Sequence, residues 1–110
     1  MAYRVEIAPR ALRDIEEAFL YIQTESPSGA ARWLREIIDA ILSLKSLPHR
    51  CPTVPDLLRG GVPVRVLLTG LTLPYKVFFT VVPGSRSSGV VRILHVRLAL
   101  RGPWLREELS

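Results

Sequence analysis

Near its C-terminus the chain reads Val90-Val91-Arg92-Ile93-Leu94-His95-Val96-Arg97-Leu98-Ala99-Leu100-Arg101-Gly102-Pro103-Trp104. The pattern is that of an apolar strand threaded with arginines and followed by a short tail. The charge around it is one-sided, because residues 57–106 contain eight cationic side chains and neither Asp nor Glu. The eight are Arg59, Arg65, Lys76, Arg86, Arg92, Arg97, Arg101 and Arg106. A β-rich half with this bias indicates a negatively charged partner.

Composition and length set the broad class. A chain of 110 residues, 48% hydrophobic and 23% charged, is expected to form one domain over residues 1–110. The lone Cys51 has no partner for an internal disulfide, which favours a reducing cytoplasm. The sequence has no apolar run long enough for a membrane span and no apolar leader at its start. A cytoplasmic protein without membrane contact is therefore expected.

Two helices are predicted after a first short strand over residues 3–7. Pro9 suits a first helical position, and apolar residues at spacings of three and four continue to about Thr24. Ser26 and Pro27 read as a cap and first helical residue of a second helix that runs to about Leu47. The two helices should form an antiparallel hairpin, because only a few residues join them. The inward residues expected are Leu12, Ile15, Phe19 and Ile22 of the first helix, and Trp33, Ile37, Ala40, Ile41 and Leu44 of the second.

Three strands are predicted in the second half. Residues 49–63 are expected to form a loop, because prolines and the pair Gly60-Gly61 interrupt regular structure there. Strands follow over residues 64–68, 75–82 and 90–98, and the short turns between them favour antiparallel neighbours. Ile93, His95 and Arg97 are expected on one side of the last strand. The predicted class is α+β, in the order β-α-α-β-β-β, with an antiparallel sheet covered on one face by the helical hairpin.

This layout resembles the RelE/ParE superfamily of bacterial toxins, the plasmid-stabilisation family of type II toxin–antitoxin modules. Five pieces of sequence carry the resemblance, in the family's order and over nearly the whole chain. They are the opening residues 3–15, the helix–turn–helix of residues 21–34, the helix exit Ile41-Leu42-Ser43-Leu44 to Pro52, the strand Tyr75-Lys76-Val77-Phe78-Phe79, and the last strand Ile93-Leu94-His95-Val96-Arg97. The chain looks closer to ParE. The resemblance implies a growth-inhibiting toxin that binds a target such as DNA gyrase and is neutralised by a cognate antitoxin.

The tail departs from the pattern of many relatives, which continue after Val-Arg with His-Gly-x-Arg. This chain has Leu98-Ala99-Leu100-Arg101, so leucine stands at the histidine position and the arginine is kept. RelE-like relatives cut messenger RNA on the ribosome with a C-terminal His or Tyr and a basic cluster. An endoribonuclease is therefore the alternative reading, with Arg65, Lys76 and Arg97 as its candidate phosphate-binding residues. A third reading is an inactive module that keeps only the antitoxin interface.

Binding candidates follow from the same cations and from apolar residues of the tail. The resemblance implies that an acidic C-terminal segment of the antitoxin wraps the toxin, and such a segment would meet a cationic sheet and apolar grooves. The candidates for contact with antitoxin or target are Arg59, Arg65, Arg92, Arg97, Arg101, Leu98, Leu100 and Trp104. A free apolar groove can also pair with itself, so a homodimer or a toxin–antitoxin hetero-oligomer is compatible with the sequence. No cofactor is expected, and His49 and Cys51 alone do not make a metal site.

Overall fold

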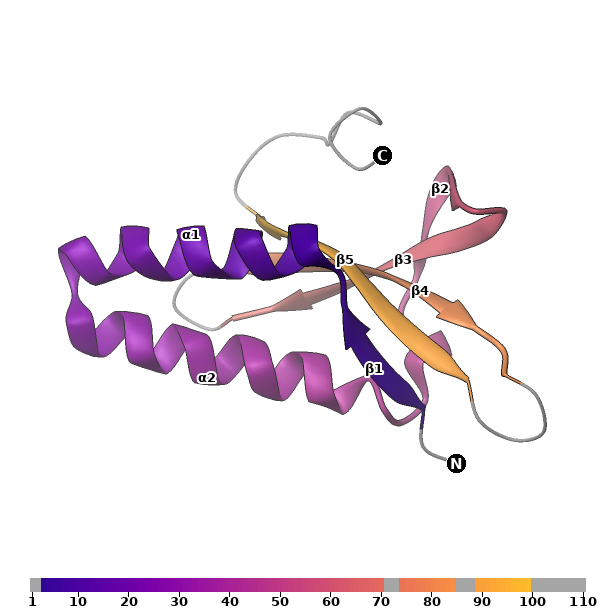
Figure 1. Ribbon diagram of the computed structural model, residues 1–110, viewed down its shortest axis with the longest axis horizontal. Coiled ribbons are helices and arrows are strands. Elements are labelled where there is room, and N and C mark those ends of the chain that lie inside the picture. The colour runs from indigo at the N-terminus through magenta and orange to yellow at the C-terminus, as the bar shows by residue number, and fades with distance from the viewer. Residues whose placement is uncertain (1–2, 71–73, 85–88, 100–110) are drawn as a thin grey trace.

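The computed structural model describes residues 3–70, 74–84 and 89–99, which form two helices and a five-stranded sheet (Figure 1). The strands are β1 (Arg4–Ile7), β2 (Thr53–Arg59), β3 (Val62–Thr69), β4 (Tyr75–Val82) and β5 (Val90–Leu98). The helices are α1 (Pro9–Glu25) and α2 (Pro27–Ser43), and a short 3₁₀ turn, η1 (Pro48–Arg50), follows α2. The order across the sheet is β1-β5-β4-β3-β2.

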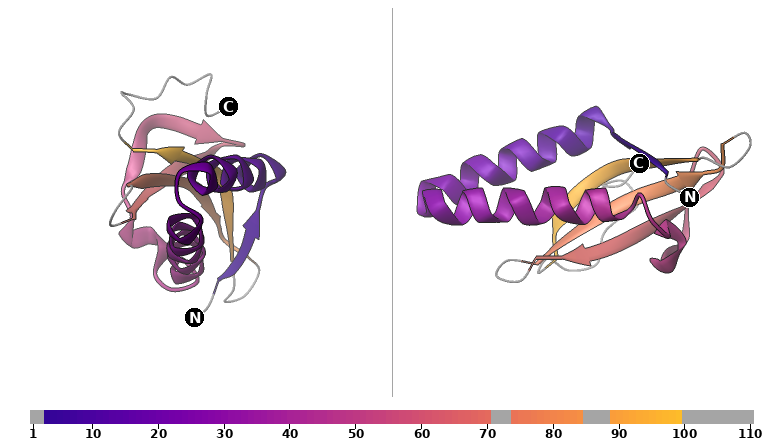
Figure 2. Two further views of the ribbon diagram at one scale, coloured as in Figure 1. Left: turned by 90° about the vertical axis from the view of Figure 1, so that its left-hand side faces the viewer. Right: turned by 90° about the horizontal axis from the view of Figure 1, so that it is seen from below.

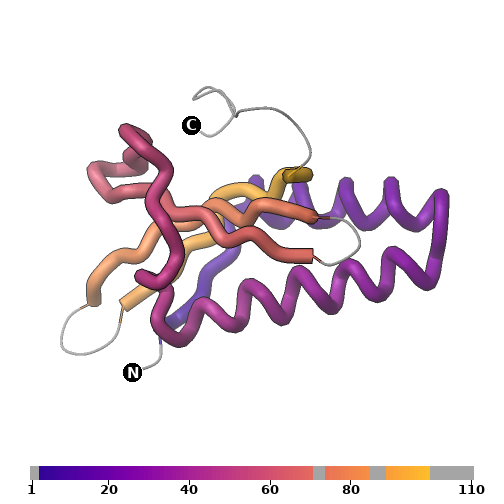
Figure 3. Tube along the Cα trace, turned by 180° about the vertical axis from the view of Figure 1, so that it is seen from behind, coloured from indigo at the N-terminus to yellow at the C-terminus, as the bar shows by residue number. Residues whose placement is uncertain are grey.

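The predicted α+β class and the helical hairpin are confirmed. Helices α1 and α2 run antiparallel and cover one face of the sheet, as the view from below shows (Figure 2). Seen from behind, the strands lie in front of the helices and cross them obliquely (Figure 3). The sheet is mixed rather than wholly antiparallel, because β1 pairs in parallel with β5 while the other pairs are antiparallel. The α-helical hairpin between β1 and the later strands permits this parallel pair, since it supplies the long crossover that parallel neighbours need.

The predicted loop over residues 49–63 is wrong, because this segment holds strand β2. Strand β2 pairs antiparallel with β3, and the register places Leu58 opposite Pro63 and Arg59 opposite Val62. Gly60 and Gly61 both have positive φ, as a tight two-residue hairpin turn requires. Pro55 is compatible with this strand because β2 lies at the edge of the sheet, where a missing N–H breaks no ladder.

The helix-covered face of the sheet contains the larger core. The ring centroids of Trp33 on α2 and Tyr75 on β4 are 5.0 Å apart, which joins the helical hairpin to the sheet. Leu12, predicted to face this core, is 49% exposed, and Ala11 and Asp14 are buried on α1 instead. The buried members of the core include Ile15, Trp33, Ile37, Ile41, Leu44, Val77, Phe79, Val91, Ile93 and Val96.

The opposite face has a second, smaller core of its own, made by Leu57 of β2, Val64 of β3, Phe78 of β4 and Leu94 of β5. Strand β5 contains a β-bulge that decides which core its residues join. Phe78 pairs with His95 and Phe79 pairs with Ile93, so Leu94 is the extra residue. Leu94 and Val96 would share a face in a regular strand. The bulge sends Leu94 to the second core and Val96 to the larger one. The predicted grouping of Ile93 with His95 and Arg97 is therefore wrong.

Candidate functional site

The edge of β5 beyond Ile93 is covered by a side chain instead of a strand. Strand β1 ends at Ile7, and its parallel pairing with β5 ends at the same level, opposite Ile93. Further along β5, the Val96 N–H donates to Asp14 Oδ2 of α1 at 3.0 Å. Asp14 thus takes the place of a β-strand neighbour and closes an edge that would otherwise present unpaired backbone groups.

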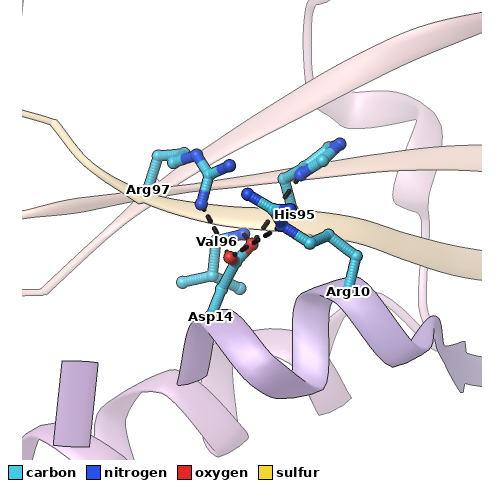
Figure 4. A network of polar contacts seen from close by, with 5 residues as sticks. All are labelled: Arg10, Asp14, His95, Val96 and Arg97. Atoms are coloured by element: carbon cyan, nitrogen blue, oxygen red, sulfur yellow. Dashed lines mark hydrogen bonds and ion pairs between the residues drawn. The ribbon is translucent and has the colours of Figure 1, made fainter. Parts of the chain in front are cut away.

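Asp14 is the centre of a polar network that joins α1 to β5 (Figure 4). Arg97 Nη1 donates to Asp14 Oδ1 at 2.6 Å, and Arg10 Nε donates to the same oxygen at 3.3 Å. His95 Nδ1 lies 3.7 Å from Asp14 Oδ2, a contact longer than a hydrogen bond. The Asp14 and His95 side chains are almost fully buried, whereas the Arg97 side chain is 18% exposed and that of Arg10 is about half exposed.

The network holds Asp14 in its charged form. Burial, the largest single influence, raises the pKa of Asp14, because a low-dielectric interior disfavours a carboxylate. The nearby His95 imidazole, the Val96 N–H and the charge and hydrogen bond of Arg97 act in the other direction. Their sum outweighs burial, so the pKa of the Asp14 carboxyl lies below its ordinary value. The folded protein therefore favours the Asp14 carboxylate over the acid.

Two cations face each other next to this network. Lys76 of β4 pairs directly with Arg97 of β5, and such like-charged cross-strand pairs are unfavourable unless an anion is near. Asp14 supplies one negative charge to Arg97. Arg92 lies further along β5 opposite Thr80, and its ion pair with Glu6 spans 3.4 Å between half-exposed side chains. Lys76, Arg92 and Arg97 form the basic face, on the side of the sheet away from the helices.

The three candidate catalytic residues do not share one face of the sheet. Arg65 pairs with Phe79, a member of the larger core, so the Arg65 side chain extends from the helix-covered side of the sheet. Its Nη1 donates to the carbonyl oxygens of Cys51 at 2.7 Å and His49 at 3.3 Å, which ties β3 to the η1 turn. Burial raises the pKa of the neighbouring Cys51 thiol, although the charges of Arg50 and Arg65 oppose this effect. Lys76 and Arg97 lie on the opposite side.

The remaining candidates for partner contact are divided between surface, core and the segment beyond residue 99. Arg59 is exposed at the end of β2, beside the hairpin turn. Leu98 is half-buried and packs against the larger core. Leu100, Arg101 and Trp104 lie outside the described residues. The structure thus places Lys76 and Arg97 next to each other and Arg92 further along the same side of the sheet. It places Arg59 on the edge strand β2 and Arg65 on the helix-covered side.

Asp14 and His95 belong to this site, although the sequence did not indicate a role for them there. Neither residue is among the candidates for catalysis or partner contact, and both are buried in the structure. A signal for Asp14 did exist, since Ala11, Asp14, Ala18 and Ile22 follow each other at helical spacings of three and four.

The comparison with protein families identifies the class of protein. A family model described as the ParE toxin of the type II toxin–antitoxin system parDE matches residues 5–99. A search of curated proteins found no match. The match covers both helices and all five strands, apart from the first residue of β1. The chain therefore carries the toxin domain of a type II toxin–antitoxin module. It belongs to the ParE toxin family.

Membership of this family implies an antitoxin as partner. Within the described ranges of the chain, neither helix has the length and apolar character that a bilayer crossing demands. Strand β5, which ends at Leu98, carries Arg92 and Arg97 of the basic face and also His95 and Val96 of the Asp14 network. The cationic residues Arg101 and Arg106 follow in the sequence.

Proposed function

We propose that this protein is a ParE-like toxin that arrests growth in the bacterial cytoplasm by binding DNA gyrase, and that its cognate antitoxin neutralises it. Family membership supports the toxin class. The observation that favours binding over RNA cleavage is the division of the three candidate phosphate-binding residues between opposite sides of the sheet. Phosphoryl transfer needs cations that converge on one phosphate together with a proton donor and acceptor. Arg65 and Arg97 are instead bonded to groups of the protein.

The gyrase proposal is tested with a supercoiling assay on the purified protein. We expect inhibition that rises with toxin concentration and that an equimolar amount of antitoxin reverses. Normal supercoiling in the presence of excess toxin would contradict the proposal. Incubation with translating ribosomes tests the endonuclease alternative, which predicts cleaved messenger RNA. Expression without antitoxin tests the inactive-module alternative, because an inactive module permits growth.

The basic face is the proposed contact for the acidic antitoxin segment. Lys76 is half-buried and makes no ion pair with any residue among 3–70, 74–84 and 89–99, so its charge can serve a partner. We expect Lys76→Glu to weaken antitoxin binding about tenfold, with a shallower salt dependence, because an attractive charge contact becomes repulsive. Isothermal titration at two salt concentrations measures both effects.

A matched control for Lys76→Glu is Arg13→Glu, which makes the same change of net charge on the exposed surface of α1. If both variants weakened antitoxin binding equally, the affinity would depend on the net charge of the toxin and not on the basic face. An unchanged affinity of Lys76→Glu would place the contact elsewhere.

A further inference from the structure

The turn after α2 holds a leucine in an unfavourable backbone conformation. Leu47 has φ 49° and ψ 52°, in the left-handed region. Glycine usually occupies a left-handed backbone position, because a Cβ atom crowds the following carbonyl oxygen there. Leu47 is also 76% exposed, the highest value among the exposed large hydrophobic residues of the described chain. Neither backbone preference nor packing within the chain explains a leucine at this position.

The turn is held rigid by Arg50. Its Nη1 donates to the carbonyl oxygens of Ser46 at 2.7 Å and Leu47 at 3.1 Å, and its Nη2 donates to Ser43 Oγ at 3.0 Å. The Arg50 backbone N–H donates to the Leu47 oxygen as well, at 3.1 Å. These bonds also satisfy carbonyl groups just beyond the C-terminus of α2, where a cation is favoured. The backbone that carries Leu47 is therefore held in place, so a partner that binds there need not order this turn.

The surroundings of Leu47 are cationic. Lys45 and Arg50 flank it in the sequence, and Arg65 reaches the same turn from β3 through the carbonyl oxygens of His49 and Cys51. Residues 45–55 contain no Asp or Glu. The chemistry that complements this turn is an apolar pocket with carboxylates at its rim. An acidic segment with interspersed apolar side chains provides both.

We propose that Leu47 is an anchor residue for the antitoxin, inserted between apolar side chains of the antitoxin while carboxylates of the same segment meet Lys45 and Arg50. The inference rests on the proposed neutralisation by an antitoxin and assigns it a contact on the toxin. It accounts for a strained backbone at an exposed residue, because strain of this kind persists at sites of binding and function.

The variant Leu47→Gly separates binding from stability, because the two are expected to change in opposite directions. Removal of the Cβ atom relieves the backbone strain, and this gain exceeds the extra flexibility of glycine in the unfolded chain, so Tm rises by about 4 °C. Loss of the anchor weakens antitoxin binding at least about 30-fold. Calorimetric melting of the free toxin and titration with purified antitoxin measure the two quantities.

Two further variants complete the test. Leu47→Met keeps a large apolar side chain and should retain the affinity. Leu20→Gln removes a leucine that is 59% exposed on α1, near the other end of the helical hairpin, and should leave the affinity unchanged. Absence of any complex between wild-type toxin and antitoxin would refute the proposed neutralisation and the anchor with it. A wild-type complex together with unchanged affinity of Leu47→Gly would overturn the anchor alone, as would loss of toxicity with antitoxin affinity retained, since the occupant would then be the target.

Discussion

Replacement of Asp14 with alanine is expected to lower the free energy of unfolding by about 3–5 kcal/mol, the range for breaking a buried ion pair by removing one partner. The change leaves the Val96 N–H without its acceptor and leaves Arg97, with an 18% exposed side chain, without its carboxylate. It also exposes the Lys76–Arg97 cross-strand pair to its full repulsion. Urea unfolding at pH 7, followed by circular dichroism, measures the difference.

The control for Asp14→Ala is Glu17→Ala, which removes an exposed carboxylate from the next turn of the same helix. Its effect should stay within about 0.5 kcal/mol, as for ordinary surface substitutions. Equal losses for the two variants would show that removal of any carboxylate from α1 has this effect, and that the buried network does not make Asp14 special. A loss under about 1 kcal/mol for Asp14→Ala would mean that water or another donor replaces the carboxylate without difficulty.

The acid dependence of stability distinguishes the charge of Asp14 from its shape. The pKa of Asp14 is lowered in the folded protein, so its contribution is fully present above the unfolded pKa of about 4 and is lost as pH falls through the folded pKa. Asp14→Asn has a similar shape and no titration in this range. The gap in unfolding free energy between wild type and Asp14→Asn should therefore narrow as pH falls below about 4. A gap that is independent of pH would refute the charged role.

The sequence predicted the elements whose signals are local. Pro9 and Pro27 marked the helix starts, and the apolar spacing of α2 identified Trp33, Ile37 and Ile41 as core residues. The alternation in β4 and β5 predicted two long strands, and short connections predicted their antiparallel pairing. These features depend on the 3.6 and 2.0 residue periods of helix and strand, which neighbouring residues determine among themselves.

The features that were missed depend on contacts between distant parts of the chain. Strand β2 contains Pro55 and was read as a loop, and only its place at the sheet edge makes that proline acceptable. Asp14 is buried because β1 ends early and leaves part of β5 uncovered. Its hydrogen-bond partner there, Val96, lies 82 residues away in the sequence. The bulge at Leu94 reverses the side of the sheet that each later side chain of β5 faces. The face that carries Lys76 and Arg97 could therefore not be assigned from alternation.

Replacement of Phe78 with alanine should destabilise the protein by about 3–5 kcal/mol, the range for truncation of a buried phenylalanine. Phe78 is 2% exposed although it lies on the face of the sheet that the helices do not cover. Its neighbours there are Leu57, Val64 and Leu94, so β2, β3, β4 and β5 all contribute to one small cluster. Phe78 also pairs with His95, next to the Asp14 network. Chemical denaturation measures the total loss.

Hydrogen exchange shows whether this second core holds β2 in place. Because Leu57 is the one residue of β2 that is buried, loss of Phe78 removes much of what attaches this edge strand to the sheet. Amides of the β2–β3 pair should then exchange faster relative to those of α1 and α2 than they do in the wild type. Leu68→Ala, at a position 65% exposed on β3, removes an apolar side chain outside this core and should leave the exchange pattern unchanged. Uniform acceleration at all amides in Phe78→Ala would instead mean that both cores unfold as a single cooperative unit, so that the helical hairpin depends on the second core as much as β2 does.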